Sequence, residues 1–397
     1  MEAEKEVLRI LKREGVELVA TLPCEKIKRL LFLLERDADF KKIHLLKEED
    51  GVGVCAGFAL AGGRPALLIQ SSGLGNAFNA LLSLSAFYRL PLPVLASWRG
   101  VFKEKIEAQI PFNRPLPAVL SAFGIPHKEI HTAEDLDALE DVVSIAFKEE
   151  MPAVALISPR VWEESSEGCE FSAPKRESWR KALMFECNVS PPEMTRFEAI
   201  KIIAEHLNEE IVVSNIGVPS KELFAARDRA LNFYMLGSYS QASCIGFGIS
   251  LRTSLPVFVL DGDGSLLATS ILPVIAEHAP ENLTIFCLDN GTFGSTGNQP
   301  TQAFSQVDME LLAKSFGFVQ TEKVQNASQL KGVLKKIAEE PALRFVHVLL
   351  KPGNADVRNV GLDALEIKRR FRIALELAEQ RKEKEEKGGI ENCASER

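Results

Sequence analysis

The stretch PVFVLDGDGS, residues 256–265, decides how the second half of the chain folds. Its first five residues form an apolar run typical of a buried strand, and residues 261–264 leave that strand through two aspartates and two glycines. One glycine is enough for an ordinary turn. Because glycine lets a backbone approach a ligand without a Cβ clash, we expect the chain to pass close to a bound group at this point.

The run that follows predicts a second strand beside the first. Residues 282–288 are mostly apolar and predict this strand, and about residues 265–278 have mostly the pattern of a crossover helix, with Pro273 marking its kink or start. Two parallel strands end at the same edge of a sheet. We therefore expect Asp263 and Asn290 to emerge close together, although they are 27 residues apart in the sequence.

The side chains expected at this edge favour a hard metal ion. Asp263 offers a carboxylate, Asn290 an amide oxygen, and the irregular stretch 291–294 main-chain carbonyls. Such oxygen sets suit Mg²⁺ or Ca²⁺, and an incomplete shell leaves positions for phosphate oxygens and water. The start of the following helix favours a nearby anion. We predict a metal and diphosphate site, although the turn alone is equally compatible with an ordinary strand-to-helix connection with capping residues.

Strand-like apolar runs alternate with helix-like segments along the whole chain. This alternation predicts an α/β fold built from parallel sheets with helices on both faces. The runs are ELVATL (17–22), PALLIQ (65–70), LPVLAS (92–97), PAVALIS (152–158), EIVVSN (210–215), PVFVLD (256–261), LTIFCLDN (283–290) and FVHVLLK (345–351).

The length of 397 residues exceeds what one hydrophobic core usually supports, so we expect two domains. Residues 166–192 are rich in serine, proline and charge, which indicates a linker between a domain at 1–165 and a domain at 193–375. Each domain contains a strand, a glycine-containing turn and a helix, which fits two open parallel-sheet domains of one general type. Residues 376–397 are charged and poor in apolar side chains, which indicates a solvated helix end or a disordered tail.

The composition narrows the class of protein. Hydrophobic residues make up 46% of the chain, charged residues 26%, and the net charge is -8, which gives no electrostatic reason to bind nucleic acid or anionic lipid. The first residues predict a helix with Val7, Ile10 and Leu11 on one face, without the apolar core of a signal peptide, and no run predicts a transmembrane helix. The seven cysteines lack zinc-site spacing, so we expect reduced thiols in a cytoplasmic protein, with Cys55 and Cys287 packed in apolar surroundings.

A family resemblance rests on the pattern Gly-Asp-Gly, 25 further residues, Asn290 and then GTFGSTG. This pattern resembles the metal and diphosphate motif of thiamine-diphosphate-dependent enzymes. The resemblance implies that Asp263, Asn290 and the backbone carbonyl of Thr292 hold Mg²⁺, which bridges the diphosphate of the cofactor.

The same cofactor needs a carboxyl group beside its aminopyrimidine ring, and the segment KEEDGVGVCAGFALAGG (47–63) supplies candidates. The family pattern places this glutamate nine residues before a glycine-aromatic pair, here Gly57-Phe58, which selects Glu48 as the catalytic residue. Glu49 and Asp50 are interpreted as the acidic first turn of a helix. For Glu48 we prefer the catalytic role, because the metal motif and this motif agree independently.

A second glycine-containing turn, QSSGLGNAFN at residues 70–79, half resembles a dinucleotide-binding loop. Phe78 occupies its final small-residue position, however, and no acidic residue follows about 20 residues later. A nicotinamide oxidoreductase is therefore the weaker interpretation, and Glu48 argues against a non-catalytic cofactor-binding protein.

Four segments narrow the resemblance to the sulfopyruvate decarboxylase family and, more distantly, to phosphonopyruvate decarboxylases. They are residues 48–84, 97–111, 212–238 and 289–301, and the resemblance covers about residues 5–372. It implies a pyrimidine-binding domain followed by a diphosphate-binding domain, without a middle domain, in a fused form of two chains that are separate in many relatives. It also implies a homodimer or larger homo-oligomer with its sites at the subunit interface.

The family reaction is the non-oxidative decarboxylation of 3-sulfopyruvate to sulfoacetaldehyde and CO₂ through the thiamine diphosphate ylide, a step in coenzyme M formation. Decarboxylation of phosphonopyruvate or another 2-oxo acid is the alternative. The resemblance implies that further residues contact the cofactor: Ser72, Gly73, Gly75, Asn76, Asn215, Gly217, Gly237, Ser238, Tyr239, Gly262, Gly264, Ser265 and Phe293. Tyr239 departs from the family, in which this position is a methionine within Gly-Ser-Met-Gly.

The substrate of this family carries two anionic ends. The segment SWRGVFKEKIEAQIPFNR (97–114) has a local excess of two positive charges in an acidic chain, so we expect Arg99 and Gln109 to contact the substrate. The six histidines are dispersed, and no adjacent pair suggests a catalytic role for them.

Overall fold

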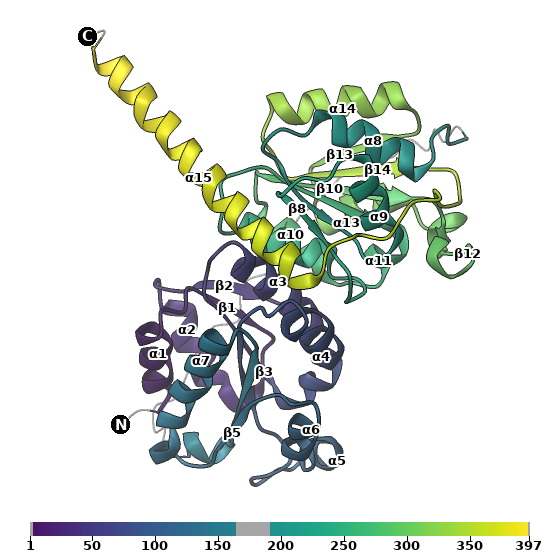
Figure 1. Cartoon of the computed structure of the whole chain (residues 1–397). Helices are drawn as coiled ribbons and strands as arrows, with labels where there is room; N and C mark the ends of the chain where they lie inside the picture. The colour runs from purple at the N-terminus through teal and green to yellow at the C-terminus, as the bar shows by residue number, and fades with distance from the viewer. Residues whose placement is uncertain (1–2, 164–190, 396–397) are drawn as a thin grey trace, which may run out of the picture. The chain divides into compact units, whose positions relative to one another are not determined.

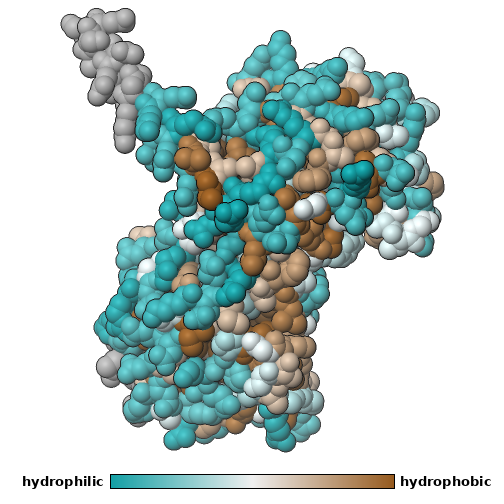
Figure 2. Space-filling view, in the orientation of Figure 1, coloured by the Kyte–Doolittle hydropathy of each residue, from teal (hydrophilic) through white to brown (hydrophobic). Residues whose placement is uncertain are grey.

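The computed structural model describes residues 3–163 and 191–395, which form two compact units (Figure 1). The predicted linker at 166–192 lies outside the described residues, apart from its last two. Hydrophilic residues cover most of the face visible in Figure 2, with hydrophobic patches between them. Within the described ranges, every helix is too short or too polar to span a membrane.

The first unit contains a six-stranded sheet in which every neighbouring pair is parallel. The strand order is β2-β1-β3-β4-β6-β5. The strands are β1 (Leu18–Thr21), β2 (Lys41–His44), β3 (Pro65–Gln70), β4 (Leu92–Ser97), β5 (His127–Ile130) and β6 (Pro152–Ile157). The helices are α1 (Ala3–Arg13), α2 (Lys28–Arg36), α3 (Glu48–Leu60), α4 (Leu74–Ala80), α5 (Ile110–Asn113), α6 (Leu116–Ala122) and α7 (Asp137–Glu149), with short turns of other helix types that include η2 (Ser71–Gly73) and η4 (Glu107–Gln109).

Helices cover both faces of this sheet, as the alternation of apolar runs predicted. On one face α1, α2 and α7 share a buried cluster with alternate residues of the strands, among them Val19, Leu68 and Leu95. On the other face α3 lies so close to β3 that a Cβ on Gly51 would be 2.8 Å from Leu67. The predicted helix face of α1 is confirmed, since Val7, Ile10 and Leu11 are buried.

The second unit repeats this plan with the strand order β13-β14-β10-β9-β7-β8, again with every neighbouring pair parallel. The strands are β7 (Ile211–Ser214), β8 (Asn232–Tyr234), β9 (Val257–Gly262), β10 (Leu283–Asp289), β13 (Gln320–Val324) and β14 (Arg344–Leu349), and a separate antiparallel pair joins β11 (Thr292–Phe293) to β12 (Gln299–Pro300). The helices are α8 (Arg196–His206), α9 (Val218–Ala226), α10 (Ala242–Ser250), α11 (Asp263–Leu267), α12 (Ile271–His278), α13 (Met309–Phe316), α14 (Ala327–Glu339) and α15 (Ala364–Ser395).

All eight apolar runs are strands, so the predicted α/β class with two open parallel sheets is confirmed. The crossover after β9 is divided into two helices, α11 and α12, and Pro273 lies in the first turn of α12, where its missing N–H costs no helical hydrogen bond. Cys55 and Cys287 are buried, as expected.

The predicted charged tail, which begins at residue 376, is helical as far as Ser395, where α15 ends. Its first turns pack on β8, with Phe371 edge-on to Phe233. Within the predicted tail, Ala378 is fully buried, and Nζ of Lys382 donates to the carbonyl oxygen of Ser254 at 3.0 Å. The packing on the second unit therefore extends beyond residue 375.

Candidate functional site

The residues predicted for the site in the first unit follow the strands at the carboxyl edge of its sheet. Open α/β sheets usually bind ligands at this edge. Glu48 begins α3, which follows β2, and Arg99 follows β4. The group Ser72, Gly73, Gly75 and Asn76 lies in η2 and α4 after β3, and Gln109 ends η4.

Glu48, Gly73 and Asn76 are brought together at this edge. Nδ2 of Asn76 donates to Oε2 of Glu48 at 2.9 Å. A Cβ on Gly73 would lie 2.3 Å from Oε1 of Glu48, a distance that real Cβ atoms do not show, so a side chain here would require Glu48 to shift. Glu49 and Asp50 occupy the acidic first turn of α3, as predicted. The arrangement presents one partly buried carboxyl group with one oxygen already bonded.

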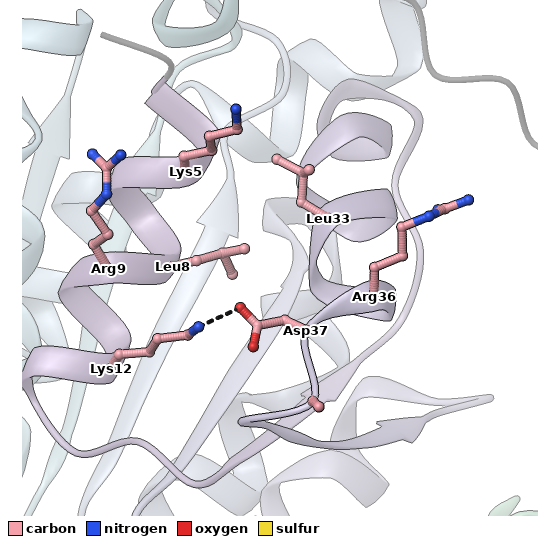
Figure 3. A pocket seen from close by; sticks show the side chains of 8 residues that line it. Lys5, Leu8, Arg9, Lys12, Leu33, Arg36 and Asp37 are labelled. Carbon is pink, nitrogen blue, oxygen red and sulfur yellow. Dashed lines mark ion pairs between the residues drawn. The ribbon is translucent and has the colours of Figure 1, made fainter.

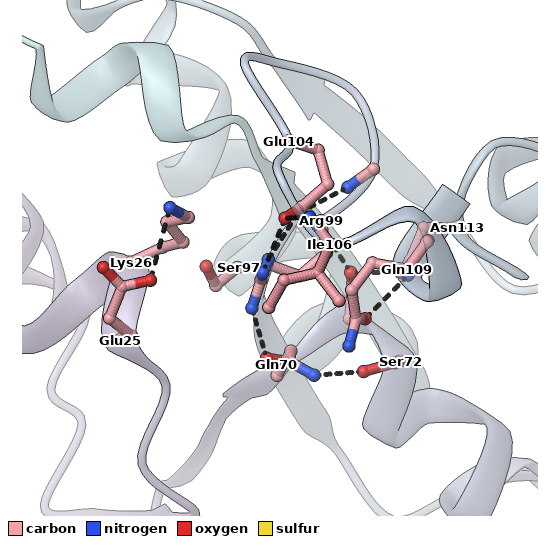
Figure 4. A network of polar contacts seen from close by, with 12 residues as sticks. Glu25, Lys26, Gln70, Ser72, Ser97, Arg99, Glu104, Ile106, Gln109 and Asn113 are labelled. Carbon is pink, nitrogen blue, oxygen red and sulfur yellow. Dashed lines mark hydrogen bonds and ion pairs between the residues drawn. The ribbon is translucent and has the colours of Figure 1, made fainter.

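Arg99 is held in a buried polar network (Figure 4). Its Nε and Nη2 donate to the two carboxylate oxygens of Glu104 at 2.7 and 2.8 Å, and Nη1 donates to Oε1 of Gln70 at 2.8 Å. The guanidinium lowers the pKa of Glu104 to about 2, and the backbone N–H groups of Ile106 and Gly100 assist. All three nitrogens of Arg99 are therefore engaged, so a direct contact with substrate would require this pair to open.

Gln109 lies at the end of η4, in the loop that follows β4 and contains Arg99. Its carbonyl oxygen accepts from Nδ2 of Asn113 at 2.6 Å, and Oδ1 of Asn113 accepts from the hydroxyl of Ser71. Because the carbonyl of Asn113 also accepts from the indole N–H of Trp98 at 3.0 Å, the loop is fixed to the strand edge. The amide of Gln109 itself has only a long contact of 3.4 Å to Asn113 and remains a candidate for substrate contact.

In the second unit, the adjacency predicted for Asp263 and Asn290 is confirmed. The β9–β10 register pairs Gly262 with Leu288, so the two strands end side by side. Oδ2 of Asp263 accepts from the hydroxyl of Thr301, and the backbone N–H of Thr301 donates to the carbonyl of Gly291 at 2.8 Å. The carboxylate of Asp263 is thereby tied to the turn that carries Asn290 and Thr292.

The electrostatics of this edge favour a cation. Burial, assisted by the nearby charge of Asp289, raises the pKa of Asp263 to about 6. Asp261 is fully buried, which raises its pKa, and it accepts from the Ser243 hydroxyl at 2.7 Å and the N–H of Gly262 at 2.9 Å. Both oxygens of its carboxylate therefore accept hydrogen bonds within the second unit.

The side chains of Tyr239 and Phe293 both lie close to Gly264. The hydroxyl of Tyr239 donates to the carbonyl oxygen of Gly264 at 2.6 Å, and a Cβ on Gly264 would lie 2.6 Å from the Phe293 ring. Tyr239 follows Gly237 and Ser238, and the backbone of Ser238 has a φ of 66°, a conformation that is strained for a side-chain-bearing residue. Strain of this kind concentrates at functional sites.

Asn215 and Gly217 follow β7 at the same edge. Oδ1 of Asn215 accepts from the N–H of Ile216 at 2.8 Å, and its Nδ2 lies beside Gly262, 3.7 Å from where a Cβ would be. Gly217 has a φ of 85° and precedes α9, which explains its lack of a side chain. The second unit thus brings all its predicted site residues to one edge of one sheet.

Among the described residues, four buried side chains at this edge have polar atoms without a hydrogen-bond partner. They are the hydroxyls of Ser238 and Ser265, both amide atoms of Gln241 and Nδ2 of Asn290. Buried polar groups are normally paired, so unpaired ones indicate a place for a polar ligand. In the described ranges no three His, Cys, Asp or Glu side chains could hold a metal, so an ion here would depend on amide and carbonyl oxygens beside Asp263. This donor set fits Mg²⁺ and a diphosphate.

Several residues of these networks were not predicted, among them Glu104, which pairs with Arg99, and three that join separate segments. Thr301 reaches Asp263 across 38 residues, His347 bonds Asp289 from β14, and Gln70 connects Arg99 to Ser72. Thr301 is the last residue of the segment 289–301, one of the four segments that carry the family resemblance. Its place in that segment is the one sequence feature that could have indicated a role at the site. The other two contacts join separate strands and have no pattern in the sequence.

A separate pocket of about 370 Å³ lies between α1 and α2 (Figure 3). Lys5, Arg9, Lys12 and Arg36 line it, but Lys12 is paired with Asp37 at 2.7 Å. None of the predicted site residues lies in this pocket, so it is distinct from the carboxyl edge of the sheet.

Comparisons with known proteins agree with the two-unit division. A model described as "Thiamine pyrophosphate enzyme, N-terminal TPP binding domain" matches residues 1–113, and one described as "Thiamine pyrophosphate enzyme, C-terminal TPP binding domain" matches residues 220–348. A 4-hydroxybenzoylformate decarboxylase from Rhodococcus jostii, which is thiamine-diphosphate-dependent, has a similar structure with a TM-score of 0.67. It is 15% identical over 88% of this chain and 99% of that chain, so this likeness concerns the fold alone.

Curated relatives are more similar in sequence. The chain is 45% identical to a sulfopyruvate decarboxylase from Methanosarcina acetivorans over 94% of this chain and 98% of the relative. It is 32% identical to a phosphonopyruvate decarboxylase from Streptomyces hygroscopicus over 90% of both chains. Its halves are similar to the separate sulfopyruvate decarboxylase subunits of Methanococcus maripaludis. The beta subunit is 40% identical over 46% of this chain, the alpha subunit 37% identical over 41%, and each match covers 98% of the subunit.

Proposed function

The chain belongs to the sulfopyruvate decarboxylase family of thiamine pyrophosphate enzymes, and we propose that it is a lyase that converts 3-sulfopyruvate to sulfoacetaldehyde and CO₂. The observation that carries this proposal is the 45% identity to a sulfopyruvate decarboxylase along 98% of that protein. The phosphonopyruvate decarboxylase relative is more distant, at 32% identity, so sulfopyruvate is the favoured substrate. We further propose that the product enters coenzyme M formation.

Thiamine diphosphate, when bound, supplies the electron sink that decarboxylation of a 2-oxo acid needs. In the first unit, Glu48 would hold a proton at the pyrimidine ring. Because Asn76 donates to Oε2, the oxygen that remains for the ring is Oε1, the one beside Gly73. Gly75 and Ser72 would line the same ring pocket.

In the second unit, Asp263, Asn290 and the carbonyl of Thr292 would hold Mg²⁺. Thr301 already donates to Oδ2 of Asp263, which leaves Oδ1 for the ion. Glycines 262 and 264 would allow the backbone to approach the diphosphate, and the unpartnered hydroxyl of Ser238 would supply a donor to it. The remaining cofactor contacts would come from Asn215, Gly217, Gly237, Tyr239, Ser265 and Phe293.

We propose a cytoplasmic homodimer or larger homo-oligomer. Large apolar side chains are exposed beside both edges described above, which favours coverage by another protein surface. In the first unit these are Val101, Ile106 and Phe112, exposed by 39%, 52% and 37%, and in the second unit Tyr239, Phe293 and Phe304, exposed by 43%, 37% and 58%.

The test is a comparison of substrates. Purified protein with Mg²⁺ and thiamine diphosphate is incubated with 3-sulfopyruvate, phosphonopyruvate or pyruvate, and CO₂ release is measured. We expect the highest kcat/KM with 3-sulfopyruvate; faster release from phosphonopyruvate would overturn the choice of substrate. Asp263→Ala should remove the Mg²⁺ dependence of cofactor binding, because one carboxylate supplies the main charge of the proposed metal site.

A further inference from the structure

In the first unit, Arg99 begins a series of hydrogen bonds that continues through Gln70 to Ser72 (Figure 4). Arg99 determines which group donates and which accepts at each step. A guanidinium contains only donors, so the amide of Gln70 must present its oxygen to Nη1 of Arg99, at 2.8 Å. The thiol of Cys24, 3.5 Å from the same oxygen, favours the same orientation. The amide nitrogen of Gln70 consequently faces the other way and donates to the hydroxyl oxygen of Ser72.

This orientation is fixed because Arg99 cannot turn. Its guanidinium donates two hydrogen bonds to the carboxylate of Glu104. The side chains of Arg99 and Glu104 are only 5% and 4% exposed. Glu104 also accepts from the N–H groups of Gly100 and Ile106, at 3.2 and 3.1 Å. Removing one partner of such a buried pair leaves an uncompensated charge, which is strongly unfavourable.

The hydroxyl of Ser72 accepts from Gln70, so its own hydrogen points elsewhere. Among residues 3–163 and 191–395, no acceptor receives it. Ser72 is half-buried at the carboxyl edge of the sheet and precedes Gly73, which lies against Glu48. A donor that no described acceptor receives therefore lies next in sequence to the glycine that faces the proposed catalytic carboxyl group.

We propose that the Ser72 hydroxyl donates to an anionic oxygen of the bound 2-oxo acid, and that Gln70 and Arg99 are positioning residues for this donor. The inference rests on the proposed function for the class of substrate. A 2-oxo acid with a second acidic group has only acceptor oxygens at its two ends, which a hydroxyl hydrogen matches. Arg99 then acts on the substrate through Gln70 and Ser72, and its charge is neutralised by Glu104.

Gln70→Glu tests the direction of the chain. The variant side chain has the same shape and keeps an acceptor for Arg99, but it has no N–H for Ser72, whose hydroxyl should then turn its hydrogen towards residue 70. The probe is 3-sulfopropanoate, which has both acidic groups and no 2-oxo group, titrated by calorimetry into the enzyme loaded with Mg²⁺ and thiamine diphosphate. We expect Ser72→Ala and Gln70→Glu each to raise its Kd about tenfold.

The double variant separates this mechanism from simple repulsion by the new carboxylate. If Gln70 acts through Ser72, the double variant binds no more weakly than Gln70→Glu alone, whereas repulsion would add to the loss in Ser72→Ala. Ser83→Ala, which removes a hydroxyl that bonds the carbonyl of Asn79 at 2.7 Å, is the matched control and should leave the Kd unchanged.

Four outcomes would overturn the proposal: wild-type affinity in either single variant, additive losses in the double variant, a loss confined to cofactor affinity, or no binding of 3-sulfopropanoate by the wild type. The KM for 3-sulfopyruvate provides a second readout and should rise about tenfold while kcat changes much less. Since the titration needs no turnover, failure of the wild type to decarboxylate 3-sulfopyruvate would count against the proposed function alone.

Discussion

Nε2 of His347 lies 2.7 Å from Oδ2 of Asp289, and both side chains are almost completely buried. The other oxygen of Asp289 accepts from the N–H of Gly291 at 2.9 Å. His347, on β14, therefore supports the turn that carries Asn290 and Thr292 without reaching the proposed metal position itself. Groups that orient metal ligands in this way contribute to affinity nearly as much as some ligands do.

Replacing His347 by leucine should weaken the proposed Mg²⁺ site. The change leaves one buried oxygen of Asp289 unpaired, so we expect the Mg²⁺ concentration for half-maximal cofactor binding to rise about tenfold or more. A Mg²⁺ titration followed by quenching of intrinsic fluorescence measures it. His206→Leu, at an exposed position on α8, is the control, and an unchanged midpoint in His347→Leu would show that Asp289 does not need this partner.

Glu48→Gln should remove most turnover while the cofactor still binds. Glutamine keeps an oxygen for Asn76 but cannot transfer a proton, so kcat should fall about 10²- to 10⁴-fold. Glu49→Gln changes the next residue, which pairs with Lys47 at 2.6 Å, and should retain wild-type kcat. Full activity of Glu48→Gln would exclude the proposed proton role.

Tyr239→Phe should weaken cofactor binding by about fivefold, because the hydrogen bond to Gly264 is worth roughly 1 kcal/mol. Burial raises the pKa of Tyr239, and the charges of Asp261 and Asp263 add to this effect, so the hydroxyl stays protonated and donates throughout the neutral range. The ratio of wild-type to variant affinity should therefore be constant between pH 6 and pH 9. Tyr239→Met, which keeps the bulk and restores the family residue, should resemble Tyr239→Phe; a larger loss in Tyr239→Met alone would assign the ring an additional role.

Glu104→Gln should reduce the free energy of unfolding at pH 7 by at most about 3 kcal/mol. Arg99 holds the folded-state pKa of Glu104 at about 2, below its ordinary value of 4.5, so the stabilisation is present above pH 4.5 and is lost as the pH falls towards 2. The difference between wild type and variant should shrink over that interval in chemical denaturation experiments. A difference that is independent of pH would mean that the ion pair is not its source.

Mixing two inactive variants tests the proposed assembly. If each site combines Glu48 of one subunit with Asp263 of another, refolding Glu48→Gln together with Asp263→Ala should restore about a quarter of wild-type activity, since half of random dimers are mixed and one site of each is intact. Sites formed within one chain would give no recovery. Each variant refolded alone provides the background.

The sequence indicated the inner strands of both sheets but not their edges. Within the two six-stranded sheets, the four strands absent from the predicted runs are β2, β5, β8 and β13, which are the two outer strands of each sheet. β2 reads KKIH and β13 reads QTEKV, because an edge strand is partly exposed and does not need a continuous apolar run. Strand order also depends on tertiary packing, which local patterns do not contain.

The same distinction applies to the site. Adjacency of Asp263 and Asn290 followed from parallel strands alone, since both residues directly follow a strand. The engagement of Arg99 by Glu104 could not be predicted from net charge, because counting charges in 97–114 does not show which of them pair. Contacts such as Thr301 to Asp263 depend on how a loop returns to the sheet, and no local pattern encodes that path.

The absence of a side chain at Gly73 is a feature by which homologous proteins can be compared. Any side chain at this position would displace the carboxyl group of Glu48, since even a methyl group would lie 2.3 Å from Oε1. A homologous protein that keeps the glutamate but carries alanine or serine at the equivalent of residue 73 would have to move that glutamate. Inspection of these two positions thus indicates whether a homologue holds its glutamate as this chain does, before any protein is purified.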